Sequence, residues 1–81
     1  MSRKQSSNGE DSTEVLVTVD RTHRGMLPEV SRRLKSAGLT EEARYEISGV
    51  IAGRAALSNL SKLKEVEGVA AVEQEPTFRA T

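Results

Sequence analysis

The sequence predicts an α+β fold of the ferredoxin-like type, with two helices packed on one face of a four-stranded antiparallel sheet. Two observations lead to this fold class. Strand-like patterns rich in small and β-branched residues occur in "EVLVTVD", "ARYEISGVIAGRA" and "VAAVE". Apolar residues recur at spacings of three and four in the two stretches between them. Along the chain these patterns follow the order β-α-β-β-α-β.

Length and composition limit the function. A chain of 81 residues builds one small domain with a single core. With 12 Lys and Arg against 12 Asp and Glu it lacks the charge that favours nucleic acid or anionic membranes. The sequence contains no cysteine, which excludes disulfides, thiolate metal sites and a cysteine nucleophile. With neither a membrane span nor a signal peptide in view, we expect a cytoplasmic protein.

The chain divides into three parts. Residues 1–13, "MSRKQSSNGEDST", contain almost nothing apolar and are expected to form a disordered N-terminal arm. Residues 14–75 form the predicted ferredoxin-like domain. Residues 76–81 follow the last strand pattern as an extended C-terminal tail.

The first strand and helix are the clearest elements. Valines alternate with other residues in "EVLVTVD", which is typical of a strand with one buried face. The period then changes to that of a helix over about 27–37. Pro28 suits its first turn, and Gly38 suits the left-handed residue that follows a helix.

Two further strands are predicted around a tight turn at Ser48-Gly49 in "ARYEISGVIAGRA". Their register stays open at this point. A two-residue turn places Ile47 and Val50 on one face, whereas a three-residue turn pairs Ile47 with Ile51. We favour an inward face made of Ile51, Gly53 and Ala55.

A short second helix is predicted at about 59–66, with Ser58 as its N-cap and Gly68 as its stop. The segment "VAAVE" then supplies the fourth strand, with Val72 inward. Gly53, inside a strand, is expected to mark close packing beneath a helix.

The helices cover only one face of the predicted sheet. The open face is expected to carry Leu16, Thr18 and either Val50 or Ile51, of which the favoured register selects Val50. Such an apolar patch can mark a partner surface. The alternative is a few scattered apolar residues on an ordinary surface.

The sequence contains no recognisable catalytic, metal-binding, phosphate-binding or RNA-binding motif. His23 is the single histidine, and without a second histidine or a cysteine it is expected to be an exposed loop residue. The glycines do not have the spacing of a phosphate-binding loop. Tyr45 and Phe78 lie off the central strands, which leaves the base-stacking positions of an RNA-recognition motif empty. We therefore expect no enzyme, no metal and no cofactor.

The second half of the chain contains segments that resemble those of a known protein family. The small-residue strand "IAGRAAL", the pair Leu60 and Leu63, and above all "EGVAAVEQE" are similar to the propeptide domains of subtilisin-like serine proteases, the I9 inhibitor family. The last segment resembles that family's G-V-x-x-V-E-x-[DE] signature. The resemblance implies a ferredoxin-like domain that inhibits a subtilisin-like protease or assists its folding, here in trans as a stand-alone domain.

The same resemblance assigns roles to individual residues. It implies that the open face packs on two protease helices, with Glu73 and Glu75 at the helix N-termini, where a carboxylate meets free N–H groups. The tail is expected to lie in the active-site cleft like a cleaved product, with Thr81 at the primary specificity pocket and Phe78 three residues before it. The expected protease-binding tail comprises Phe78, Arg79, Ala80 and Thr81.

Alternatives remain open. In the alternative interpretation Phe78 covers an end of the protein's own core, and Glu73 and Glu75 are solvated charges at the end of a strand. The rival function is a small regulatory or ligand-sensing module that forms a weak homodimer through its open sheet face.

Overall fold

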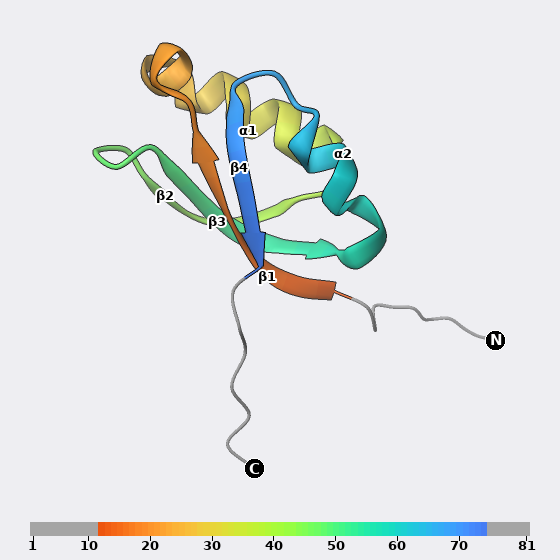
Figure 1. Cartoon of the computed structure of the whole chain (residues 1–81). Helices are drawn as coiled ribbons and strands as arrows, with labels where there is room; N and C mark the ends of the chain where they lie inside the picture. The colour runs from red at the N-terminus through yellow and green to blue at the C-terminus, as the bar shows by residue number, and fades with distance from the viewer. Residues whose placement is uncertain (1–11, 75–81) are drawn as a thin grey trace, which may run out of the picture.

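The computed structural model describes residues 12–74, which form one antiparallel sheet with two α-helices (Figure 1). The predicted α+β class is confirmed, and the strand order β2-β3-β1-β4 is consistent with the ferredoxin-like arrangement. The elements in chain order are β1 (Ser12–Val19), the 3-10 helix η2 (Arg21–Met26), α1 (Leu27–Ser36), β2 (Thr40–Tyr45), β3 (Val50–Ala56), the 3-10 helix η3 (Leu57–Asn59), α2 (Leu60–Lys64) and β4 (Val69–Gln74).

The core lies between the helices and one face of the sheet. Val15, Val17 and Val19 of β1 are fully buried, as the alternation predicted. They form one cluster with Leu34 of α1 and Leu63 of α2. On β3 the inward residues are Ile51, Gly53 and Ala55, which confirms the favoured inward face, and Val72 of β4 packs against the same cluster.

The ends of the first helix follow local sequence signals. α1 begins at Leu27 with Pro28 in its first turn, where the missing N–H costs nothing. Gly38 follows the helix with a φ of 110°, a conformation that glycine adopts without strain. The 3-10 turn η2 before this helix was not predicted.

Two predicted element ends are corrected. Ser12 and Thr13 belong to β1, because they pair with Ala56 and Ala55 of β3, so the N-terminal arm cannot extend to residue 13. Ser58 does not cap the second helix: it lies in η3, and α2 begins at Leu60 after Asn59, whose side chain makes no capping hydrogen bond.

The β2–β3 connection is longer than the predicted tight turn. Tyr45 pairs with Val50, so four residues, 46–49, form the loop. The loop closes through a 2.8 Å hydrogen bond from the Gly49 N–H to the Tyr45 carbonyl. Ile47, expected on a strand face, lies in the loop and is 96% exposed.

Gly53 marks a close approach of two strands rather than of a strand and a helix. A Cβ at this position would collide with the carbonyl oxygen of Thr40 on β2. The adjacent irregularity in β2, where Glu41 pairs with Gly53 but Ala43 pairs with Ala52, leaves Glu42 as an extra residue. This β-bulge accompanies the close approach of the β2 backbone to Gly53.

Candidate functional site

The open face of the sheet begins with two side chains of β1. Successive residues of a strand point to opposite faces, so the burial of the β1 valines places Leu16 and Thr18 on the face away from the helices. Both residues are half-buried. They occupy the middle of the sheet, since β1 lies between β3 and β4.

Neighbouring strands extend this face on both sides. Thr18 lies opposite Val50 of β3 and opposite Ala71 of β4, and directly opposed residues share a face. Leu16 likewise lies opposite Ala52 and Glu73. The structure therefore places four sequence-predicted site residues on one surface: Leu16, Thr18, Val50 and Glu73.

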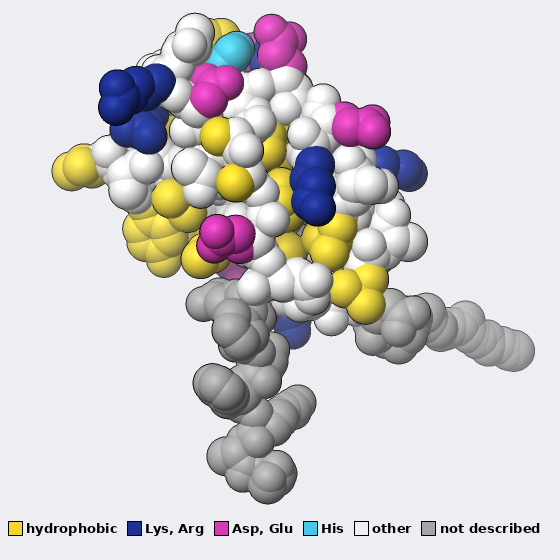
Figure 2. Space-filling view, in the orientation of Figure 1, with side chains coloured by type: hydrophobic (Ala, Val, Ile, Leu, Met, Phe, Trp, Pro, Cys, Tyr) yellow, Lys and Arg dark blue, Asp and Glu magenta, His cyan; other side chains and the backbone are white. Residues whose placement is uncertain are grey.

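Tyr45 also belongs to this face, and the sequence interpretation did not place it there. It pairs with Val50, which puts it on the open face, and it is 53% exposed. Figure 2 shows hydrophobic side chains gathered over the β2–β3 hairpin, on the left of the view. The signal in the sequence was the period-two spacing of Ala43 and Tyr45, but without the hairpin register it could not be assigned to a face.

Charged side chains border the apolar residues. Arg54 Nη1 donates to Glu14 Oε2 at 2.9 Å, and this pair spans β3 and β1. Glu73 is exposed, and none of the salt bridges within residues 12–74 includes it. An exposed carboxylate next to Leu16 is thus available to a donor on a partner.

The remaining predicted site residues lie outside the described part of the chain. They are Glu75 and the tail residues Phe78, Arg79, Ala80 and Thr81. Their assignment to a protease-binding tail stays a prediction.

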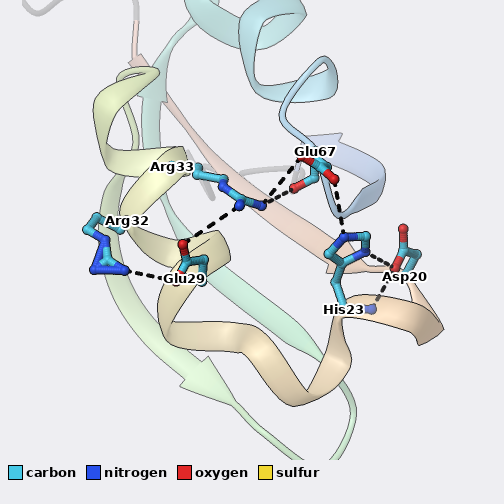
Figure 3. A network of polar contacts seen from close by, with 6 residues as sticks. All are labelled: Asp20, His23, Glu29, Arg32, Arg33 and Glu67. Atoms are coloured by element: carbon cyan, nitrogen blue, oxygen red, sulfur yellow. Dashed lines mark hydrogen bonds and ion pairs between the residues drawn. The ribbon is translucent and has the colours of Figure 1, made fainter.

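A second polar cluster surrounds His23 (Figure 3). Contrary to the expected exposed loop residue, the His23 side chain is only 17% exposed. Its Nδ1 lies 2.8 Å from Asp20 Oδ1, and its backbone N–H donates to the same oxygen at 2.9 Å. The hydrogen bond from the His23 ring is the main reason that the pKa of Asp20 lies below its ordinary value.

The cluster continues to the turn before β4. His23 Nε2 lies 3.7 Å from Glu67 Oε2, and Arg33 of α1 reaches the other oxygen of Glu67 at 4.0 Å. These contacts join η2, α1 and the α2–β4 turn. Within residues 12–74 no group of three or more histidine, aspartate or glutamate side chains could hold a metal ion.

Comparison with known proteins adds no relative. No family model, no curated protein and no solved structure matches the chain. Among residues 12–74, no helix has the length and apolar character needed to cross a bilayer.

Proposed function

We propose that the chain is a stand-alone inhibitor, or folding partner, of a subtilisin-like serine protease, and that it docks through the open face of its sheet. The observation that carries the proposal is the position of Glu73, which lies on the open face directly opposite Leu16. A docking surface needs an apolar centre and a polar group that fixes orientation. Leu16, Val50 and Tyr45 provide the first, and Glu73 provides the second.

The chemistry of Glu73 fits a helical partner. The first N–H groups of a helix lack partners within the helix and carry a partial positive charge. An exposed carboxylate at the end of an apolar patch can accept hydrogen bonds from such a terminus while the patch packs on the helix side. In this proposal Glu75 serves a second helix, and Phe78 to Thr81 lie extended in the protease cleft, pairing by main-chain hydrogen bonds.

The proposal assigns no catalytic role, no cofactor and no nucleic-acid or membrane partner to the chain. A cytoplasmic location is part of the proposal, and a chain without cysteine has no disulfide that a reducing compartment would break. The rival function is a regulatory module in which a second copy covers the same face. The half-exposed Tyr45 beside Val50 favours this candidate equally, because the patch does not depend on the tail.

Titration of a subtilisin with the full-length protein and with a version ending at Pro76 separates the candidates, with cleavage of a chromogenic peptide as the readout. We expect competitive inhibition by the full-length chain and its loss on deletion of residues 77–81. Absence of inhibition by the full-length chain, together with a dimer in sedimentation velocity, would contradict the inhibitor proposal and favour the rival function.

Matched variants test the face itself. Glu73→Gln removes a charge–dipole interaction of about 0.3–1 kcal/mol and should weaken inhibition about two- to fivefold. Tyr45→Ala should weaken it about tenfold if the ring is buried as an anchor. Ile47→Ala is the control, because this exposed apolar residue lies in the hairpin loop, outside the strands of the open face. Equal effects of Tyr45→Ala and Ile47→Ala would contradict docking through the open face.

A further inference from the structure

The two edges of the sheet differ in how they are protected. β2 and β4 are the outer strands, and an outer strand presents unpaired backbone groups that can pair with another chain. On β2 the bulge at Glu42 interrupts regular pairing, and Glu41 and Arg44 are charged residues that point toward α1, where both contact Ser31. Bulges and inward-pointing charges are two devices that block strand addition.

β4 has less protection over its regular part. Its register with β1 shifts near Val19, but from Ala71 to Gln74 the pairing is regular. This regular part contains no proline, and its one charged residue, Glu73, points to the open face rather than inward. No described residue pairs with the outer side of this strand, because β4 ends the strand order.

The hydrogen-bond pattern identifies the free backbone groups of β4. The Val19 N–H donates to the Gly49 carbonyl at 2.8 Å, so Val19, Val17 and Val15 direct their backbone groups toward β3. The alternate β1 residues, Thr18 and Leu16, therefore direct theirs toward β4. These two pair with Ala71 and Glu73, which leaves the N–H and C=O groups of Val72 and Gln74 pointing outward.

A hollow lies beside this edge. It has a volume of about 310 Å³ and is lined by Val69, Ala70, Ala71, Val72 and, from α2, Lys64. Its floor is apolar and its charged wall is an ammonium group. No salt bridge within residues 12–74 includes Lys64.

We propose that the outer edge of β4 binds an extended peptide by strand addition, and that the preferred peptide places an apolar side chain in the hollow and a carboxylate at Lys64. Main-chain hydrogen bonds from Val72 and Gln74 hold the peptide, while alternate side chains give the specificity. The backbone groups that bind this peptide point outward in the plane of the sheet, whereas the proposed protease contact uses side chains of the open face; Ala71 borders both surfaces.

Charge selects the peptide over a second copy of the chain. In an antiparallel β4–β4 dimer, a two-fold axis perpendicular to the sheet keeps the helices of both copies on the same side. A second copy then adds another Lys64 on the helix side of the joined sheet, and its β4 brings no carboxylate to that side, because Glu73 points to the open face. An acidic peptide turns the same lysine into an attractive contact.

The test uses a synthetic probe, Thr-Val-Thr-Glu-Thr-Val-Thr, titrated into the ¹⁵N-labelled full-length protein and followed by amide chemical shifts. Residues of one face alternate along a strand, so Val and Glu of the probe share the side of Lys64. We expect shifts at residues 70–74 and at Lys64, and none at Tyr45 or Val50. A probe with Lys in place of Glu should bind about fivefold more weakly, from the loss of one surface ion pair and the gain of a like-charge contact.

Three controls make the result decisive. Lys64→Gln should remove the preference for the Glu probe, and probes N-methylated at alternate residues should not bind. Gln74→Pro removes one outward N–H from an exposed position and should weaken both probes; if this variant is unfolded by circular dichroism, the N-methylated probes test the same hydrogen bonds.

Several outcomes would overturn the proposal. Absence of shifts at residues 70–74 at millimolar probe excludes strand addition at β4. Equal affinity for the Glu and Lys probes excludes the carboxylate preference. A concentration-dependent dimer that Gln74→Pro abolishes would show that a second copy, rather than a peptide, occupies the edge.

Discussion

Replacing Gly53 by alanine tests the closest backbone approach in the sheet. The new Cβ would collide with the Thr40 carbonyl oxygen and would lie 3.1 Å from the Glu41 Cα, so the obstacle is backbone, which cannot rotate away. Overpacking of this kind costs about 1–3 kcal/mol. Alanine also reduces the conformational entropy of the unfolded chain, which stabilises the folded state by about 0.4–1 kcal/mol. We therefore expect a net loss of about 1–2 kcal/mol in the free energy of unfolding.

Gly25→Ala is the matched control, because a Cβ there meets nothing within 4 Å and its φ is not in the left-handed region. It changes the unfolded chain in the same way without a collision. For a domain of this size, 1 kcal/mol corresponds to about 4–8 °C in Tm. The Tm of Gly53→Ala should lie about 5–10 °C below the Tm of Gly25→Ala. Urea unfolding of the two variants should rank their stabilities in the same order. Equal stability of the two variants would refute the inferred approach of β2 to Gly53.

Two further predictions concern stability. Leu63→Ala leaves a cavity at a fully buried position and should lower the free energy of unfolding by about 2–4 kcal/mol, measured with urea. The control Leu57→Ala, at a partly exposed position, should lower it by less than about 1 kcal/mol. Similar losses in the two variants would contradict the role of α2 in the core. Desolvation, the largest single effect on Glu41, raises its pKa, but hydrogen bonds from Ser31 and Arg44 and nearby positive charge outweigh it and lower the pKa overall. A lowered folded-state pKa stabilises the fold above the ordinary pKa of glutamate, and this stabilisation disappears as the pH falls through the folded-state value. Glu41→Gln should therefore make stability depend less on pH in the acid range. Glu29→Gln should have a smaller effect, because the hydrogen bond from Arg32 also lowers the pKa of Glu29 but this pair is exposed to solvent.

The sequence was sufficient for the fold class because local signals agreed with one another. Alternating valines in β1, Pro28 at the start of α1 and Gly38 at its end each favour the element that the structure contains. Agreement across such levels is what allows one fold to be specified. Each of these signals involves residues that are close together in the sequence, so it can be recognised without knowledge of tertiary contacts.

The prediction of a tight turn between β2 and β3 was wrong for a physical reason. Ser48-Gly49 has the composition of a tight turn, but the chain closes a wider loop through the hydrogen bond from Gly49 to Tyr45. Ile47 then lies in the loop, although an apolar β-branched residue is typical of a strand. The inward position of Ile51 is compatible with more than one loop length, and the pairing of Tyr45 with Val50 that fixes the observed length is not evident from the pattern around the turn.

The candidate site could be predicted only in part. Leu16, Thr18 and Val50 follow from alternation within their own strands. The juxtaposition of Glu73 with Leu16 depends on the register between β1 and β4, which lie at opposite ends of the domain sequence. Only the resemblance to the propeptide signature had singled out Glu73 beforehand.

The bulge at Glu42 links the protected edge of the sheet to its open face. Without an extra residue, side chains at 41, 43 and 45 would share one face, because the period of a strand is two. The bulge changes the phase, so Glu41 turns inward to Ser31 while Tyr45 turns outward beside Val50. One inserted residue thus blocks the β2 edge with inward charge and adds an aromatic ring to the open face. Deletion of Glu42 should therefore alter both properties together, whereas substitutions at Tyr45 should alter the open face alone.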